Sequence, residues 1–127
     1  MKILAADDER PALCILNRAI LEAVPGAELR SFTHASEAMA EICERGFRPD
    51  VAFLDISMPG KSGLEMAAIL KIHHPAVSIV FVTGYSSSAT NALARRPCGY
   101  IMKPATREKI LCELQNLREP PQRTTPD

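Results

Sequence analysis

Short apolar runs alternate with amphipathic segments along this chain. The run over 51–55 is apolar up to its last residue, Asp55, and is bounded by Asp50 and by Pro59-Gly60. A short continuous run between such breakers is typical of a strand buried on both faces of a parallel sheet. Similar signals predict strands over 2–6, 28–32, 78–82 and 99–102. Apolar residues at helical spacing predict helices over 11–23, 36–45, 64–72, 86–95 and 106–118.

Strands and helices therefore alternate five times without a break. This alternation implies parallel crossover connections and a doubly wound α/β fold with helices on both faces of the sheet. The 127 residues are enough for one ordinary domain. Periodicity stops after Arg118, so we expect one domain over 1–118 and a Pro-rich linker or disordered tail over 119–127.

Composition narrows the class of protein. Lys+Arg and Asp+Glu number 15 each, so the formal net charge is zero, and we expect no direct nucleic-acid binding by this fragment. No apolar run approaches the roughly 20 residues that a bilayer span needs, and the first residues are apolar for too short a distance to be a secretory signal. We therefore expect no membrane association and a cytoplasmic location.

Four cysteines are scattered along the chain without a Cys-x-x-Cys pair or zinc spacing: Cys14, Cys43, Cys98 and Cys112. Three of them fall in helical patterns of apolar residues. We expect reduced thiols in or near the core of a cytosolic protein.

Polar side chains stand at the ends of four of the five expected strands. Asp7 and Asp8 follow the first strand, Asp55 ends the third, Thr83 follows the fourth, and Lys103 follows the fifth. Ligands of open α/β sheets bind at this edge. Taken singly, each residue has a simpler explanation, such as a helix-dipole partner, a turn residue or a surface charge. Together, three carboxylates repel one another unless a cation intervenes, and such oxygen-rich groups suit Mg²⁺.

At this point the chain resembles a known family, the receiver (phosphoacceptor) domain of two-component response regulators. Four motifs at strand ends carry the resemblance: Asp7-Asp8, Leu54-Asp55-Ile56-x-Met58-Pro59-Gly60, Val82-Thr83-Gly84 and Tyr100-Ile101-Met102-Lys103-Pro104. The resemblance covers residues 2 to about 118. It implies a flavodoxin-like (βα)5 fold whose five-stranded parallel sheet has the order 2-1-3-4-5. Receivers joined to LytTR-type DNA-binding domains are the most similar.

The resemblance also implies roles for the site residues. Asp55 would accept a phosphoryl group from a sensor histidine kinase, and Lys103 would pair with Asp55 and then with a phosphate oxygen. The ligands of Mg²⁺ would be Asp7, Asp8, Asp55 and the backbone carbonyl of Ser57. The Lys103-Pro104 peptide bond is a candidate for the cis form.

Switching would follow from the added charge. The Thr83 hydroxyl would donate to a phosphate oxygen, and Tyr100 would swing into the space that Thr83 leaves. Ser57 and Tyr85 would flank the path of an attacking water and modulate the lifetime of the acyl phosphate. The helix over 86–95 has few apolar anchors and is expected to be the least stable element. Partners would be an output domain or another partner beyond residue 118, and a second copy of the chain through the fourth helix, fifth strand and fifth helix.

Two alternatives remain open. One is a Mg²⁺-dependent phosphohydrolase with an aspartate nucleophile, but such enzymes usually carry a second acid two residues after the nucleophile, where this chain has Ser57. The other is a receiver-like interaction module that is never phosphorylated, whose usual mark is loss of the acceptor, the lysine or the acidic pair. We expect a phosphoacceptor rather than an enzyme of multiple turnovers.

Overall fold

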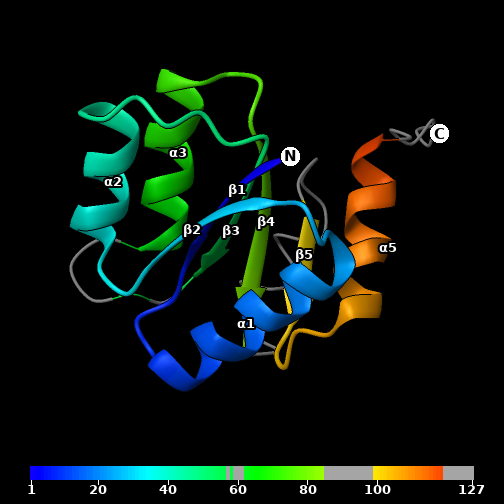
Figure 1. Cartoon of the computed structure of the whole chain (residues 1–127). Helices are drawn as coiled ribbons and strands as arrows, with labels where there is room; N and C mark the ends of the chain where they lie inside the picture. The colour runs from blue at the N-terminus through cyan, green and yellow to red at the C-terminus, as the bar shows by residue number, and fades with distance from the viewer. Residues whose placement is uncertain (57, 59–61, 85–98, 119–127) are drawn as a thin grey trace, which may run out of the picture.

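A computed structural model of the chain describes residues 1–56, 58, 62–84 and 99–118 (Figure 1). The elements are β1 (Lys2–Ala6), α1 (Arg10–Ala23), β2 (Glu28–Phe32), α2 (Ala35–Cys43), β3 (Val51–Asp55), α3 (Gly63–His73), β4 (Ser78–Thr83), β5 (Gly99–Met102) and α5 (Arg107–Arg118). The helix expected over 86–95 and the tail expected over 119–127 lie outside the described residues, so both stay predictions.

The five strands form one parallel sheet in the order β2-β1-β3-β4-β5. This is the predicted flavodoxin-like order, and it is confirmed. The central strand β3 is buried along its whole length, as its unbroken apolar run predicts. In register, Asp55 lies opposite Val82, and Thr83 lies opposite Met102. The strands therefore bring their last residues to the same edge.

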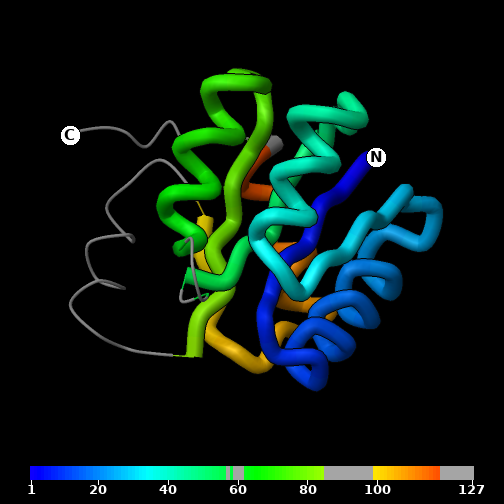
Figure 2. Tube along the Cα trace, turned by 90° about the vertical axis from the view of Figure 1, so that its left-hand side faces the viewer, coloured from blue at the N-terminus to red at the C-terminus, as the bar shows by residue number. Residues whose placement is uncertain are grey.

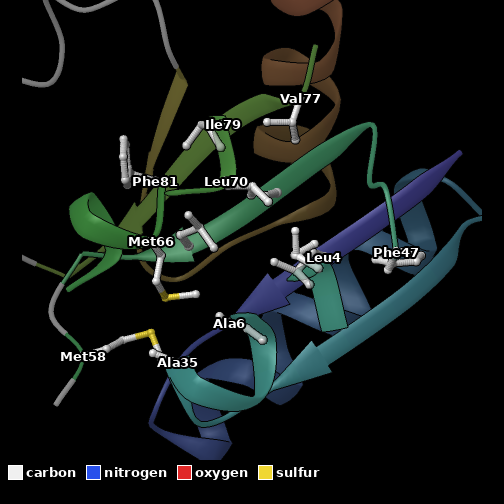
Figure 3. Packing of buried hydrophobic residues seen from close by; sticks show 14 residues of the cluster. Leu4, Ala6, Ala35, Phe47, Met58, Met66, Leu70, Val77, Ile79 and Phe81 are labelled. Atoms are coloured by element: carbon white, nitrogen blue, oxygen red, sulfur yellow. The ribbon is translucent and has the colours of Figure 1, made fainter. Parts of the chain in front are cut away.

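Helices cover both faces of the sheet, with α1 and α5 on one face and α2 and α3 on the other (Figures 1 and 2). Successive residues of a strand point to opposite faces, so β3 supplies Phe53 to one core cluster and Leu54 to the other. Figure 3 shows the cluster under α2 and α3, which includes Met66 and Leu70 of α3 and Leu4 of β1. The two clusters pack against opposite faces of the strands whose last residues share this edge.

Helix boundaries follow local chemistry. Pro11 stands in the first turn of α1, where a missing backbone N–H removes no helical hydrogen bond. A capping box begins α3: the Glu65 N–H donates to Ser62 Oγ at 3.2 Å, and the Ser62 N–H donates to Glu65 Oε1 at 3.0 Å. Gly46 follows α2 with a φ of 72°, which suits glycine after a helix end.

The prediction of core thiols is wrong for the cysteines that the structure describes. Cys14, Cys43 and Cys112 are free and exposed, and Cys98 lies outside the described residues. The apolar stripe of α1 runs through Leu13 and Leu16, and Cys14 falls one position around the helix on the solvent side. The helical periodicity does not predict whether a small apolar residue next to the buried stripe is itself buried.

Some large apolar residues of the helices are exposed. Ile72 near the end of α3 is 77% exposed, and Leu111 of α5 is 37% exposed, whereas the neighbouring Ile110 is fully buried.

Within the part of the chain that the structure describes, no helix is long and apolar enough to cross a bilayer.

Candidate functional site

Three aspartates meet where β1 and β3 end. Asp7 directly follows β1 and is 1% exposed, and Asp55 is the last residue of β3 and is 5% exposed. Asp8, the next residue after Asp7, is more accessible. One carboxylate oxygen from each lies within 4.8 Å of the others. The three aspartates that the sequence predicts at this edge of the sheet therefore do lie close together.

Backbone contacts hold Asp7 in place. Its N–H donates to the carbonyl of Phe32 at 3.1 Å, which continues the β1–β2 pairing past the end of the strand. Its Oδ1 accepts the Glu9 N–H at 2.9 Å. The Oδ2 atom is buried and contacts an ammonium group at 2.8 Å.

That ammonium belongs to Lys103, which follows β5. Its Nζ lies 2.8 Å from Asp7 Oδ2, 3.5 Å from Asp55 Oδ2 and 3.8 Å from Glu9 Oε1. The sequence suggests pairing with Asp55, and the structure places the shorter contact at Asp7. Glu9, which immediately precedes α1, also lies near this ammonium.

The charges around Lys103 set its protonation. Burial lowers the pKa of Lys103, but the hydrogen bond to Asp7 and the negative charges of Asp55, Asp7 and Glu9 outweigh it and raise the pKa above its ordinary value. The side chain is therefore a fixed cation beside three carboxylates. It offsets part of their mutual repulsion.

The chain after β5 is fixed so that Lys103 points into the site. The Lys103 N–H donates to the carbonyl of Thr83 at 2.8 Å, and the Lys103-Pro104 peptide bond is cis. Lys109 Nζ donates to the carbonyls of Met102 and Pro104 at 3.0 and 3.1 Å. Sequence reasoning missed this role of Lys109. The available signal was a lysine in the first turn of the helix that follows the Lys-Pro pair.

The three aspartates fit a magnesium ion. Six oxygens around Mg²⁺ at about 2.1 Å stand roughly 3 to 4 Å apart, and the observed carboxylate oxygens lie within 4.8 Å of one another. All three are hard oxygen donors, and Asp7 and Asp55 are buried. Ser57, whose carbonyl is the fourth expected ligand, lies outside the described residues.

The two expected switch residues lie on neighbouring strands, β4 and β5. Thr83 is 1% exposed at the end of β4, on the site edge. Tyr100 of β5 is half-buried and packs against the core cluster under α2 and α3. Tyr85, expected to modulate the lifetime of the acyl phosphate, lies outside the described residues.

Comparison with known proteins gives a consistent result. Residues 3–115 match the family model described as the response regulator receiver domain. The chain is 35% identical over 120 residues to the transcriptional regulatory protein BtsR of Salmonella typhimurium, and 33% identical over 120 residues to the sensory transduction protein LytT of Bacillus cereus. Each match covers 94% of this chain and 48% of the relative. The chain therefore spans about half the length of these curated relatives.

A solved structure has the same fold. A CheY-like response regulator receiver domain protein from Methanospirillum hungatei superposes with a TM-score of 0.73 at 28% sequence identity, and the match covers 93% of both chains.

Proposed function

This chain belongs to the response regulator receiver domain family of two-component systems, and from that premise we propose that it accepts a phosphoryl group on Asp55 from a sensor histidine kinase. One observation supports this most directly. The Asp55 carboxylate lies in a cluster with Asp7 and Asp8, within 4.8 Å, and 3.5 Å from the Lys103 ammonium. A nucleophilic carboxylate, an acidic metal site and a fixed cation are the parts that such a transfer needs.

In the proposed reaction, a carboxylate oxygen of Asp55 attacks the phosphorus of a phosphohistidine. The new O–P bond forms as the N–P bond breaks, and the imidazole nitrogen leaves with the electron pair. A bound Mg²⁺, held by Asp7, Asp8, Asp55 and the Ser57 carbonyl, would neutralise charge on the phosphoryl oxygens. Lys103 would bind one phosphoryl oxygen through its ammonium. The chain contributes mainly position and charge, since phosphoryl transfer requires little else from the protein.

Phosphorylation would then change the β4–β5 side of the domain. The phosphoryl group adds about −1.5 to −2 charge and three acceptor oxygens. The Thr83 hydroxyl would donate to one of them, and Tyr100 would move toward the space beside it. The surface formed by β5, α5 and the helix predicted over 86–95 would transmit the change to an output domain or to a second copy of the chain. The regulatory names of the longer relatives support an output domain beyond residue 118.

The test is labelling with a small phosphodonor, acetyl phosphate, in the presence of Mg²⁺. We expect intact mass to show one added phosphoryl group, which does not form when the metal is chelated before the phosphodonor is added. Asp55→Asn should abolish labelling. Asp50→Asn is the matched control, because Asp50 stands just before the same strand at its opposite end and binds the Lys2 N–H at 2.8 Å.

Three outcomes separate the possible functions. A single stable acyl phosphate on Asp55 supports the receiver. Release of many equivalents of phosphate per chain points to a phosphohydrolase. Neither labelling nor release points to an interaction module. Equal labelling of Asp55→Asn and the parent would reject the assignment of the acceptor.

A further inference from the structure

Gly63, the first residue of α3, lies directly against the main chain of Asp55. A Cβ atom at Gly63 would lie 2.1 Å from the Asp55 carbonyl oxygen, 2.8 Å from its carbonyl carbon and 3.0 Å from Ile56 Cα. Real Cβ atoms essentially never approach heavy atoms within 3.0 Å, so a side chain here requires a movement of about 0.9 Å. All three neighbours are backbone atoms, so no change of rotamer can make this room.

The α3 side of the contact is firmly held. The Gly63 N–H donates to the Ile56 carbonyl at 2.9 Å, and the capping box of Ser62 and Glu65 fixes the first turn. Further along the helix, Met66 and Leu70 are fully buried in the core cluster of Figure 3. Moving α3 away from the sheet would open this close-packed cluster, which is costly.

The strand side is less constrained at its end than in its middle. Phe53 and Leu54 are fully buried, one in each core cluster, so β3 cannot shift as a whole. Asp55 is the last paired residue, opposite Val82, and Ile56 beyond it is only half-buried. A displacement forced by a side chain at Gly63 therefore concentrates at Asp55 and Ile56.

We propose that Gly63 is a positioning residue for Asp55. The missing side chain lets the start of α3 sit against the Asp55 carbonyl, and this contact sets where the carboxylate stands relative to Asp7, Asp8 and Lys103. The inference rests on the proposed function for its phosphorylation readout. In group transfer, misplacing a reacting group by about 1 Å can lower the rate about 100-fold.

The experiment compares three glycine-to-alanine variants of the same chain. Gly63→Ala tests the close contact. Gly26→Ala controls for the substitution itself, since nothing lies within 4 Å of a Cβ there. Gly46→Ala controls for lost stability, because its φ of +72° strains any side chain at a place remote from the site edge. Each variant is measured by urea unfolding, by calorimetric titration with Mg²⁺ and by the rate of labelling with acetyl phosphate at saturating Mg²⁺.

We expect Gly63→Ala to label roughly 100-fold more slowly and to bind Mg²⁺ about 10-fold more weakly than the parent. Gly46→Ala should lose stability while its folded fraction keeps the parent's Mg²⁺ affinity and labelling rate, and Gly26→Ala should keep all three properties. If Gly63→Ala matches Gly46→Ala once both are corrected for the folded fraction, Gly63 is a structural glycine and the proposal is wrong.

Two further outcomes are decisive. If the parent is not labelled at all, the proposed function fails, while the Mg²⁺ titrations still decide whether Gly63 sets the geometry of the carboxylates. If Gly63→Ala does not fold in buffer, the comparison is repeated in an osmolyte that favours the compact state. A variant that stays unfolded there overturns the positioning role in favour of a purely structural one.

Discussion

At the scale of single residues, the positive charge of Lys103 offsets the repulsion among the carboxylates of the site. Its ammonium lies between the buried Asp7 and Asp55, with the shorter contact, 2.8 Å, at Asp7. Without a cation, carboxylates this close would oppose one another's ionisation. Lys103 thus stabilises the acidic cluster before any metal ion binds, and a bound Mg²⁺ would take over part of that task.

Replacing Lys103 with Gln should lower stability most when no metal is present. Removing one partner of a partly buried ion pair leaves uncompensated charge, and we expect a loss of about 1–3 kcal/mol in the free energy of unfolding. Added Mg²⁺ should recover more stability in the variant than in the parent. Urea unfolding with and without Mg²⁺ measures both effects.

Lys71→Gln is the matched control for this prediction. Lys71 is a lysine of α3 whose Nζ contacts the backbone carbonyl of Val77 at 2.5 Å, just before β4 and away from the site edge. Its loss should not change the gain in stability that Mg²⁺ provides. An equal Mg²⁺ response in both lysine variants would contradict the stated role of Lys103.

The residue scale also shows what sequence reasoning can predict of the site. The sequence predicts that Asp7, Asp55 and Lys103 lie at one edge of the sheet, because the carboxyl ends of parallel strands meet there. The preference of Lys103 for Asp7 could not be predicted, since it depends on how the chain turns after β5. The role of Gly63 was equally hidden, because a glycine at a helix start has no periodic signal and its contact is with a distant backbone.

At the scale of elements, α2 is tied to the edge strand β2 through one buried carboxylate. Glu41 of α2 is 5% exposed and forms ion pairs with Arg30 of β2 and, at 2.5 Å, with Arg45. The guanidinium of Arg30 also lies 4.6 Å from the ring centroid of Phe47. The network joins a strand, a helix and the segment after that helix.

This network predicts a pH dependence of stability. The hydrogen bond from Arg45 is the main cause that holds the pKa of Glu41 below its ordinary value, against the opposing effect of burial, and Arg30 adds to it. A carboxyl with a lowered pKa in the folded state contributes stability above its unfolded pKa of about 4.3, and loses it as the pH falls through the folded value. The urea midpoint of the parent should therefore fall more steeply than that of Glu41→Gln from about pH 5 downward.

The control for this prediction is Glu37→Gln, a change of the same kind at an exposed position in the first turn of α2. Its midpoint should follow the parent through the acid range. Parallel curves for the parent and Glu41→Gln would show that the network does not couple stability to pH.

Element boundaries were predictable where a local signal exists. The capping box of Ser62 and Glu65 gave the start of α3, and the break at Pro75 gave its end. Exposure of particular residues was less predictable, because Ile72 and Leu111 are apolar and near a buried stripe yet point outward. Periodicity identifies a helix more reliably than it assigns the residues at the margin of its buried face.

At the scale of the whole molecule, the sheet separates two apolar clusters that share the same strands. One cluster packs under α2 and α3, and the other packs under α1 and α5. Each strand contributes to both through its alternating side chains. If either pair of helices came away, one apolar face of the sheet would be exposed to water. The other pair packs on the same strands, so the two layers depend on each other.

We therefore expect a single cooperative unfolding transition. Leu70→Ala, on one face, and Ile110→Ala, on the other, should each cost about 2–5 kcal/mol, because both side chains are fully buried. Their effects should add to within about 0.5 kcal/mol, since they lie in separate clusters. Urea unfolding followed by both circular dichroism and tyrosine fluorescence measures this. Leu111→Ala, at a residue 37% exposed, is the control and should cost much less.

The three exposed cysteines have a consequence for assembly. Cys112 stands on α5, one of the elements through which a phosphorylated pair is proposed to form, and its thiol is free. Air oxidation could crosslink two copies through this position across a two-fold axis and leave a covalent pair that needs no phosphodonor. Gel-filtration profiles in a reducing agent, or with Cys112→Ser, would separate such an artefact from signal-driven pairing.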